Sequence, residues 1–359
     1  EQTFTLDTIK FYIQFNNTVL NIVFMFEGKK ILITGGTGSL GQALTQRLLD
    51  MGVETIRIFS RNEHKQIEME SKFQDERLRF LIGDVRDYRR LEMALEDIDI
   101  VFHAAALKHV PKIEYNPFEA IKTNVIGTQN VIDACLKNNV EKAVCIGTDK
   151  AVSPLNTYGS TKLLMEKLFV AANNYLNQEK HRTVFLAVRY GNVLGSSGSV
   201  IPKFIEQIKA NKPVTITDTK MTRFSITMNE ALDLILNAVT FAKGSEIFVP
   251  KLRAYNIIDV KNTLTELLTD TGEKIIGIRT GEKLHETLIN EDEIKYSWVF
   301  KNMYMIASPL YTLFNDENVK ETYQDIKKIE DIQEYSSDNV EKIPPKDLKT
   351  IIENAGLLN

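Results

Sequence analysis

The chain has 359 residues, of which 43% are hydrophobic and 26% charged, and its formal net charge is −4. This length favours one large domain with an appendage or two closely packed domains, and it allows a sizeable core. Nucleic-acid binding is disfavoured, because that polyanion requires a concentrated basic surface and the sequence contains no basic run.

Residues 1–24 contain apolar stretches that are interrupted by Gln14, Asn16 and Asn17, and they lack a basic start. They match neither a signal peptide nor a spanning helix, and we expect no integral membrane span. Met25 stands just before the first clear strand pattern, which indicates that this segment is an extension outside the fold. A peripheral amphipathic anchor is the alternative.

From residue 29 onward, short β-branched runs alternate with longer helical patterns. In chain order the predicted strands are KKILIT, TIRIF, LRFLIG, DIVFHAA, KAVCIG and TVFLAVRYG, and the intervening predicted helices cover residues 40–49, 61–73, 88–95, 118–138 and 158–176. Such alternation requires right-handed crossovers and places helices on both faces of a parallel sheet. We therefore predict an α/β fold with a Rossmann-like doubly wound parallel sheet.

Two cysteines fall within these elements, Cys135 in a predicted helix and Cys145 in a predicted strand. Neither has a His or a second Cys at metal-ligand spacing, so both are predicted to be inert core thiols and no metal site is expected. Two cysteines also provide no disulfide framework, which fits a reducing cytoplasm.

After Asn192 the alternation of strands and helices breaks down. Late segments of this kind are candidates for a smaller substrate-binding domain over the carboxyl ends of the strands, where open sheets bind ligands. The predicted boundaries are residues 25–192 and 225–255 for the dinucleotide-binding domain, 193–224 and 256–310 for the substrate-binding domain, and 311–359 for a polar tail. We expect the tail to be ordered but peripheral and mostly solvated.

The segment ITGGTGSLGQAL contains the pattern Gly36-x-Gly38-x-x-Gly41 directly after a predicted strand and directly before a predicted helix. In this context the turn lets the backbone approach a pyrophosphate, which then lies at the N-terminus of the helix. A tight strand-to-helix turn without a ligand is the alternative. The cofactor-binding residues predicted here are Gly35, Thr37, Gly38, Ser39, Leu40 and Gly41.

The second strand ends in RIFSRNEHK, roughly 20 residues further on, where an NAD site would place an acidic residue. Ser60 and Arg61 stand there instead, and a hydroxyl with a cation suits the extra 2′-phosphate, so NADP is favoured over NAD. Lys65 is a second candidate for that phosphate, while a surface charge is the alternative for Arg61. Asp84 in GDVRD is placed to accept a hydrogen bond from the adenine amino group. The other predicted cofactor contacts are Val85, Ala104, Ala105, Ala106 and Lys108.

The stretch TDKAVSPLNTYGSTK has Tyr158 at the start of a predicted helix and Lys162 one turn further on the same face. A nearby ammonium favours the phenolate and is expected to lower the pKa of Tyr158 toward the working pH. Tyr158 is then a base for a sugar hydroxyl while hydride leaves the same carbon for a nicotinamide, with Lys162 contacting that cofactor. An exposed Tyr beside an exposed Lys is the alternative.

Three residues at the start of the same stretch follow the predicted strand KAVCIG and therefore emerge at the carboxyl edge of the sheet. Thr148 can bridge the tyrosine hydroxyl and a substrate. Asp149 and Lys150 add an acid and a base beyond what hydride transfer alone requires. A surface salt bridge at the start of a loop is the alternative for this pair.

Together these motifs resemble the extended short-chain dehydrogenase/reductases that act on nucleotide sugars, and among them the inverting UDP-N-acetylglucosamine 4,6-dehydratases of polysaccharide biosynthesis. The resemblance runs from Met25 to about residue 290 and includes the later YSSDN. Its motifs are GGTGSLG, FSRNEHKQ, GDVRD, HAAALKHVP, TDKAVSPLNTYGSTK, RYGNVLGSSGSVIP, ITDTKMTRF and GEKLHE.

The resemblance implies an internal redox reaction on a UDP-sugar. Tyr158 takes the proton of the hydroxyl at carbon 4 while hydride passes to NADP; Lys150 then removes the hydrogen at carbon 5 as Asp149 protonates the hydroxyl leaving carbon 6, to which hydride returns. Inversion at carbon 5 would give a 4-keto-6-deoxy sugar nucleotide for surface-glycan or glycoprotein sugar synthesis. A lysine base needs a lowered pKa, and we expect burial beside Lys162 to supply it.

The resemblance also implies contacts to the nucleotide end of the substrate. Asn192 and Arg223 match family positions for the diphosphate, and Arg279 and Glu282 match positions near phosphate and ribose; an arginine fork suits phosphate geometry. Surface ion pairs are the alternative for the two arginines. Lys108 is expected to reach both cofactor and substrate, and the family suggests a homo-oligomer, with a hexamer as one candidate.

One departure and several rival functions accompany the resemblance. Gly147 stands where much of the family has Ser. A UDP-sugar 4-epimerase would share the cofactor turn, Tyr158 and Lys162, but it would not need Asp149 and Lys150. Epimerase-like relatives tend to have Met in place of this Tyr, which favours the dehydratase. A dehydratase that retains carbon 5 and a non-catalytic dinucleotide sensor are further alternatives.

Overall fold

The computed structural model describes residues 22–177, 179–195, 199–278, 281–307 and 316–358. The strands of its main sheet are β1 (Lys30–Thr34), β2 (Thr55–Ser60), β3 (Leu78–Ile82), β4 (Ile100–His103), β5 (Lys142–Ile146), β6 (Val184–Val188), β10 (Ile247–Pro250), β14 (Ser297–Phe300), β15 (Met303–Ile306) and β16 (Lys327–Lys328). Among the described residues, their spatial order is β16-β14-β15-β10-β6-β5-β4-β1-β2-β3. All pairs from β3 to β10 are parallel, and β15, β14 and β16 add antiparallel pairs at one edge. The order of the first six strands is that of the Rossmann fold, which confirms the predicted fold class.

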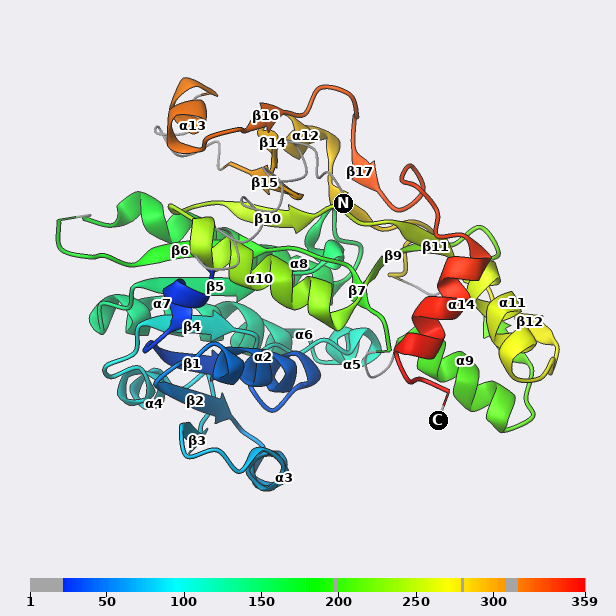
Figure 1. Ribbon diagram of the computed structural model, residues 1–359, viewed down its shortest axis with the longest axis horizontal. Coiled ribbons are helices and arrows are strands. Elements are labelled where there is room, and N and C mark those ends of the chain that lie inside the picture. Colours follow the sequence, from blue (N-terminus) through cyan, green and yellow to red (C-terminus); the bar gives the residue numbers. More distant parts are fainter. Residues whose placement is uncertain (1–21, 178, 196–198, 279–280, 308–315, 359) are drawn as a thin grey trace, which may run out of the picture.

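Helices cover both faces of this sheet (Figure 1). One face carries α2 (Ser39–Asp50), α3 (Glu63–Phe73) and α10 (Met228–Phe241), and the other carries α4 (Tyr88–Ala94), α7 (Gly127–Lys137) and α8 (Thr157–Ala172). Because side chains alternate along a strand, Ile31 and Ile33 enter the core beneath α2 and α10, while Leu32 enters the core beneath α7 and α8. Burial on both faces explains why the strands read as continuous apolar runs.

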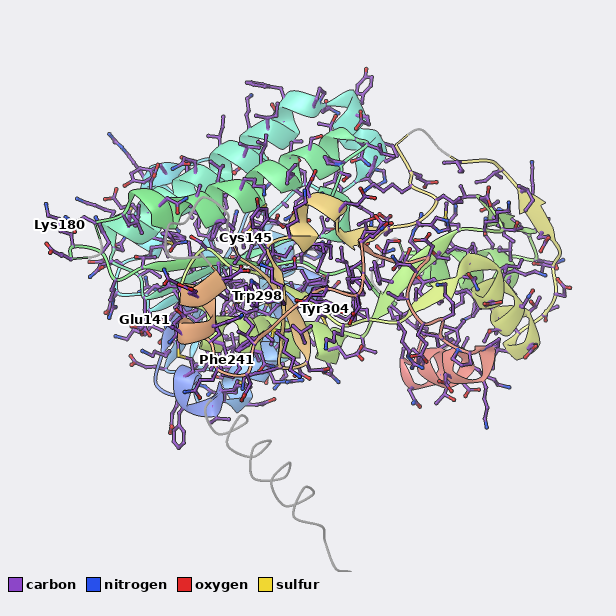
Figure 2. The ribbon with its side chains drawn as sticks, turned by 90° about the horizontal axis from the view of Figure 1, so that it is seen from above. Glu141, Cys145, Lys180, Phe241, Trp298 and Tyr304 are labelled. Atoms are coloured by element: carbon purple, nitrogen blue, oxygen red, sulfur yellow. The ribbon has the colours of Figure 1, made fainter. Side chains whose placement is uncertain are left out.

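A smaller lobe lies beyond the carboxyl ends of these strands, toward which the arrows of β1 and β2 point in Figure 1. Its elements are α9 (Val200–Lys209), β8 (Val214–Ile216), α11 (Ile257–Leu267), β12 (Glu273–Ile275) and α14 (Pro345–Asn354). They enclose a core of their own that includes Phe204, Val260, Leu264 and Leu348. Figure 2 shows this lobe, with α14 in red, beside the larger lobe that contains Trp298 and Tyr304.

Further short strands and helices lie around these two lobes. They are α5 (Val110–Tyr115), α6 (Pro117–Ala120), β7 (Asn192–Val193), β9 (Thr222–Ile226), β11 (Ala254–Asn256), β13 (Thr287–Ile289), α12 (Glu291–Ile294), α13 (Asp316–Thr322) and β17 (Tyr335–Ser336). β9 pairs with both β7 and β11, and β13 pairs with β17. These pairs fix the backbone at the mouth of the site described below.

Two parts of the chain lie elsewhere than the sequence indicated. β14 and β15 extend the main sheet, although they fall within residues 256–310, which were grouped with the substrate-binding domain. The segment 311–359 is not simply a solvated tail, because Tyr335, Ser337 and Leu348 are buried. The apolar residues of α14 recur at helical spacing and pack against α11, a tertiary contact that a polar average composition hides.

The N-terminal prediction can be followed only in part, because residues 1–21 lie outside the described ranges. Residues 22–26 are helical, Ile22 and Met25 pack against the main core, and Phe26 is buried. Residues 22–24 therefore belong to the fold rather than to an extension. No described helix has the length and apolar character needed to cross a bilayer.

Both cysteines are buried free thiols, as the sequence predicted. Burial raises the pKa of the Cys145 thiol to about 12 and that of Cys135 higher still. Neither thiol therefore ionises readily near neutral pH.

Candidate active site

A cleft of about 930 Å³ runs along the carboxyl ends of the main sheet and beneath the smaller lobe. All the predicted cofactor-binding residues line it: Gly35, Thr37, Gly38, Ser39, Leu40, Gly41, Ser60, Arg61, Lys65, Asp84, Val85, Ala104, Ala105, Ala106, Lys108, Tyr158 and Lys162. The lining also includes Thr148, Lys150, Asn192, Arg223 and Glu282. Arg279 lies outside the described residues. The fold thus brings the separate sequence motifs to one cavity.

The glycine turn between β1 and α2 leaves no room for side chains on its inner surface. Gly35 has a φ of +68°, which favours glycine, and a Cβ on Gly41 would lie 2.3 Å from the carbonyl oxygen of Gly36. No side chain caps the N-terminus of α2 at Gly38, so backbone N–H groups at the cleft have no side-chain acceptor there. This cradle fits the pyrophosphate of a dinucleotide.

Replacing Gly41 with Ala is expected to displace this turn, because the added methyl group overlaps backbone atoms that cannot rotate away. We expect a loss of roughly 1–3 kcal/mol in the free energy of unfolding, as overpacked sites show, together with weaker dinucleotide binding. Chemical denaturation and a cofactor titration measure both effects. Gln46→Ala, on the exposed side of the same helix, is the control. Unchanged affinity in Gly41→Ala would contradict the assigned turn.

Arg61 stands beyond the end of β2 with its side chain about half exposed. Its guanidinium Nη1 lies 3.7 Å from Asp84 Oδ2, and Arg86 binds the same carboxylate at 2.7 Å. Burial alone would raise the pKa of Asp84, but hydrogen bonds from Arg86 and the charge of Arg61 lower it overall. Ser60 Oγ accepts a hydrogen bond from Gln66 Nε2 at 3.0 Å. Of the two arginines beside Asp84, Arg61 makes the longer contact with the carboxylate and is therefore less tightly held than Arg86.

The loop after β4 is held by buried hydrogen bonds that the sequence did not reveal. His103 contacts the hydroxyls of Thr34 and Thr128 at 2.7 and 2.9 Å, and burial lowers its pKa to about 3, which keeps the ring neutral. Asn124 lies in a π-helix, Ile121–Ile126, and pairs with both the N–H and the carbonyl of Leu107. Such a bulge frequently marks a functional site, but it needs long-range contacts to be recognised.

The catalytic candidates meet where a short turn after β5 packs against the start of α8. The turn is a 3₁₀ helix, Asp149–Ala151, and a Cβ on Gly159 of α8 would lie 2.2 Å from the carbonyl oxygen of Lys150. Asn156 caps α8 by accepting a hydrogen bond from the N–H of Gly159. This close approach places Tyr158 beside the Asp149–Ala151 turn.

Gly147, the departure from the family pattern, has a steric explanation. Its N–H donates to the carbonyl of Val188 at 2.7 Å, and a Cβ at this position would lie 2.5 Å from that oxygen. β5 therefore approaches β6 more closely at its end than a serine would allow.

Tyr158 is almost fully buried, and its electrostatics differ from the sequence prediction. Burial raises the pKa of its phenol, and the charge of Lys150 and a hydrogen bond with Thr148 oppose that rise. Lys162 instead donates to the carbonyl of Ile146 at 2.6 Å, and burial lowers its pKa. The ammonium that favours the phenolate is thus Lys150, not Lys162.

Lys150 is the centre of the charged cluster. Its Nζ donates to Asp149 Oδ1 at 3.0 Å and to Asn192 Oδ1 at 3.2 Å, and it lies 3.6 Å from Glu286 Oε1. Burial alone would lower the pKa of Lys150, but the two carboxylates together raise it. The prediction of a lowered pKa for Lys150 is therefore wrong, because the sequence could not show that a second carboxylate would lie beside it.

Arg223 lines the cleft but is largely occupied by the protein itself. Its Nη1 donates to the carbonyls of Thr222 and Leu284, and its Nη2 donates to that of Lys283. Its Nε lies 3.6 Å from Glu286 Oε1. The structure thus shows Arg223 between the backbone and a buried carboxylate rather than as a surface charge.

Comparisons with known proteins agree with this geometry. A profile of the polysaccharide biosynthesis protein family matches residues 31–308. An inverting UDP-N-acetylglucosamine 4,6-dehydratase from Campylobacter jejuni is 48% identical over 320 residues, which cover 88% of this chain and 94% of that protein. A UDP-glucose 4-epimerase from Rickettsia bellii is 41% identical over 335 residues, with 92% and 97% covered. The X-ray structure of Pen from Bacillus thuringiensis superposes with a TM-score of 0.84 at 39% identity and covers 93% of this chain and 99% of that one. The resemblance found in the motifs is confirmed, and the chain belongs to the polysaccharide biosynthesis protein family, with inverting UDP-N-acetylglucosamine 4,6-dehydratases among its relatives.

Proposed function

We propose that this chain is an inverting UDP-N-acetylglucosamine 4,6-dehydratase. One geometric observation supports this above all: Tyr158 and Lys150 line the same cleft as the glycine turn, and the fully buried Asp149 lies directly behind them, paired with Lys150. An epimerase needs the tyrosine, whereas only a dehydration needs the added acid and base. The identity to named dehydratases favours the same reaction.

The residues fit a nicotinamide dinucleotide, held by the glycine turn, Ser60, Arg61, Asp84 and Lys162. When bound, such a cofactor accepts hydride from carbon 4 of the sugar and returns it to carbon 6. Tyr158 removes the proton of the hydroxyl at carbon 4, and the charge of Lys150 stabilises its phenolate. Because this reaction returns the hydride, the cofactor can remain bound between turnovers.

Dehydration then requires a neutral Lys150 to take the proton of carbon 5 and a protonated Asp149 to give one to the hydroxyl leaving carbon 6. In the structure the two side chains form an ion pair, with 3.0 Å between Lys150 Nζ and Asp149 Oδ1. This pair carries the same number of protons as a neutral lysine beside a protonated aspartic acid. Moving one proton across this hydrogen bond breaks an N–H bond and forms an O–H bond. It therefore yields both reactive forms without exchange with solvent.

We infer a preference for NADP from Arg61, which lines the cleft beyond the end of β2, where the sequence pattern predicts the contact to a 2′-phosphate. Arg61→Ala is expected to weaken NADP binding by about 10- to 100-fold while NAD binding changes little, because a hydrogen bond to a charged group contributes roughly 1.5–3 kcal/mol. Titrations with both cofactors measure the ratio. Arg89→Ala, an exposed arginine outside the cleft, is the control. Equal losses for the two cofactors would count against this assignment.

Proton NMR of the protein with UDP-N-acetylglucosamine in deuterated water tests the proposal. A new 6-deoxy methyl signal with deuterium at carbon 5 would establish dehydration, and the ring couplings would distinguish inversion from retention. A 4-epimer without a methyl signal would instead support the UDP-sugar 4-epimerase reaction, a candidate favoured by relatives that carry that name at 40–41% identity.

A further inference from the structure

Glu286 is a second carboxylate beside Lys150 that the mechanism above does not use. It comes directly before β13, only 3% of its surface is exposed, and it lines the cleft. Its Oε1 lies 3.6 Å from Lys150 Nζ, and its buried Oε2 has no hydrogen-bond partner among the residues that the structure describes. A buried carboxylate normally requires strong pairing, so its position beside a candidate base calls for a reason.

The late segment that contains YSSDN holds Glu286 in place. The N–H of Glu286 donates to Ser337 Oγ at 2.9 Å, and the N–H of Ser337 donates to the carbonyl of Glu286 at 2.8 Å. Thr222 Oγ1 contacts Ser337 Oγ at 2.7 Å and His285 Nδ1 at 2.8 Å. This reciprocal pairing fixes the backbone from which the carboxylate reaches Lys150.

The charges around Lys150 distinguish its two carboxylates. Glu286 Oε1 lies between two cations, Lys150 and Arg223, at 3.6 Å from each. Asp149 pairs with Lys150 and accepts a hydrogen bond from Thr148, while its buried Oδ2 has no partner within the described part of the chain. Since a guanidinium does not give up its proton, Arg223 remains a positive neighbour of Glu286 when a proton leaves Lys150.

Other titratable groups face this cluster from the elements around it. Tyr158 of α8 and Tyr255 of β11 interact with Lys150, and Lys283 interacts with Lys150 and both carboxylates. Lys283 Nζ is directed to the carbonyl of Val152. Two of the positive charges, Arg223 and Lys283, thus remain when a proton leaves Lys150.

We propose that Glu286 is a positioning residue of the dehydration: it holds the Lys150 side chain beside Asp149 and keeps the shared proton of that pair on Lys150 until the reaction draws it to Asp149. The step conserves protons, because the N–H bond broken on Lys150 is replaced by the O–H bond formed on Asp149. This inference rests on the proposed function for its role in catalysis. The effect of Glu286 on the protonation of Lys150 does not depend on the reaction and can be tested without substrate.

The first test measures Lys150 in the full ligand-free chain. Competitive labelling with acetic anhydride at a fixed alkaline pH, followed by mass spectrometry, reports the free-amine fraction of each lysine. Glu286→Gln is expected to raise the labelling of Lys150 about tenfold or more, since removing an opposite charge at this distance lowers a lysine pKa by roughly 1–3 pH units. Glu291→Gln, an exposed glutamate nearby, should leave it unchanged. Unchanged labelling in Glu286→Gln would overturn the proposal.

The second test follows the two halves of the reaction in the complete enzyme with its cofactor. In Glu286→Gln, the alkaline limb of the pH profile for dehydration should move to lower pH, because the shared proton is lost more easily. Oxidation at carbon 4 should be retained, and it is measured as reduction of the cofactor in a single turnover. Glu286→Asp, which keeps the charge, should restore part of the dehydration and also serves if the Gln variant does not fold. A lower rate with an unmoved pH profile would mean a purely structural role.

The failures of the two proposals are distinguishable. If the wild-type protein forms no methyl product, the proposed function fails, whereas a labelling change in Glu286→Gln would still show that Glu286 holds the proton on Lys150. If dehydration occurs and the labelling does not change, only the role of Glu286 is wrong.

Discussion

Replacing Tyr158 with Phe is expected to stop the reaction at its first step. The phenol is the only group in the cluster assigned to the proton of the hydroxyl at carbon 4, and without it hydride cannot leave the same carbon. Loss of a positioned general base costs about 10²- to 10⁴-fold in rate. Because the ring stays buried in the same site, the fold and cofactor binding should be preserved.

This step is measured directly by the absorbance of the bound nicotinamide as it is reduced in a single turnover. Tyr115→Phe removes the hydroxyl of a highly exposed tyrosine on α5 and provides the matched control. If Tyr158→Phe reduces the cofactor at the rate of the wild type, another residue is the base at carbon 4, and the role given to Tyr158 is wrong.

Replacing Asp149 with Asn is expected to separate the two halves of the reaction. The amide is similar in size but cannot carry the proton that the hydroxyl at carbon 6 needs in order to leave as water. Dehydration should fall by about 10²- to 10⁴-fold, while oxidation at carbon 4 persists. Reduced cofactor and 4-keto sugar nucleotide should therefore accumulate.

Two readouts from one sample test this separation: cofactor reduction, and the methyl signal of the product in the NMR spectrum. Asp292→Asn, at an exposed position on α12, is the control. Loss of both steps to the same extent would show that Asp149 supports the site as a whole instead of the leaving group. Since Asp149 is completely buried, the variant should also be compared with the wild type for cofactor affinity.

The sequence predicted the main sheet and the glycine turn because both depend on local patterns. The strands are short apolar runs between helices, and the turn requires small residues at fixed spacing. The residues after β5 were also found, since the carboxyl ends of neighbouring parallel strands meet at one edge. Most of the residues that line the cleft could therefore be predicted from these local patterns.

The features that the sequence did not reveal depend on contacts between distant segments. Glu286 lies next to β13, which pairs with β17, and it meets Lys150 from a distant part of the chain; no pattern near either residue shows that contact. The pKa of Lys150 was predicted in the wrong direction for the same reason. Lys162 was expected to act on Tyr158, but its Nζ bonds to the carbonyl of Ile146, whose position depends on the packing of α8 against β5.

The anchoring of Glu286 by Ser337 also has a consequence for the order in which the site can assemble during synthesis. Domains generally fold in order as they leave the ribosome. The glycine turn, Tyr158 and Lys150 are all translated before Ser337, which holds the backbone of Glu286. A nascent chain can thus form its dinucleotide-binding half and still lack an ordered proton-transfer cluster.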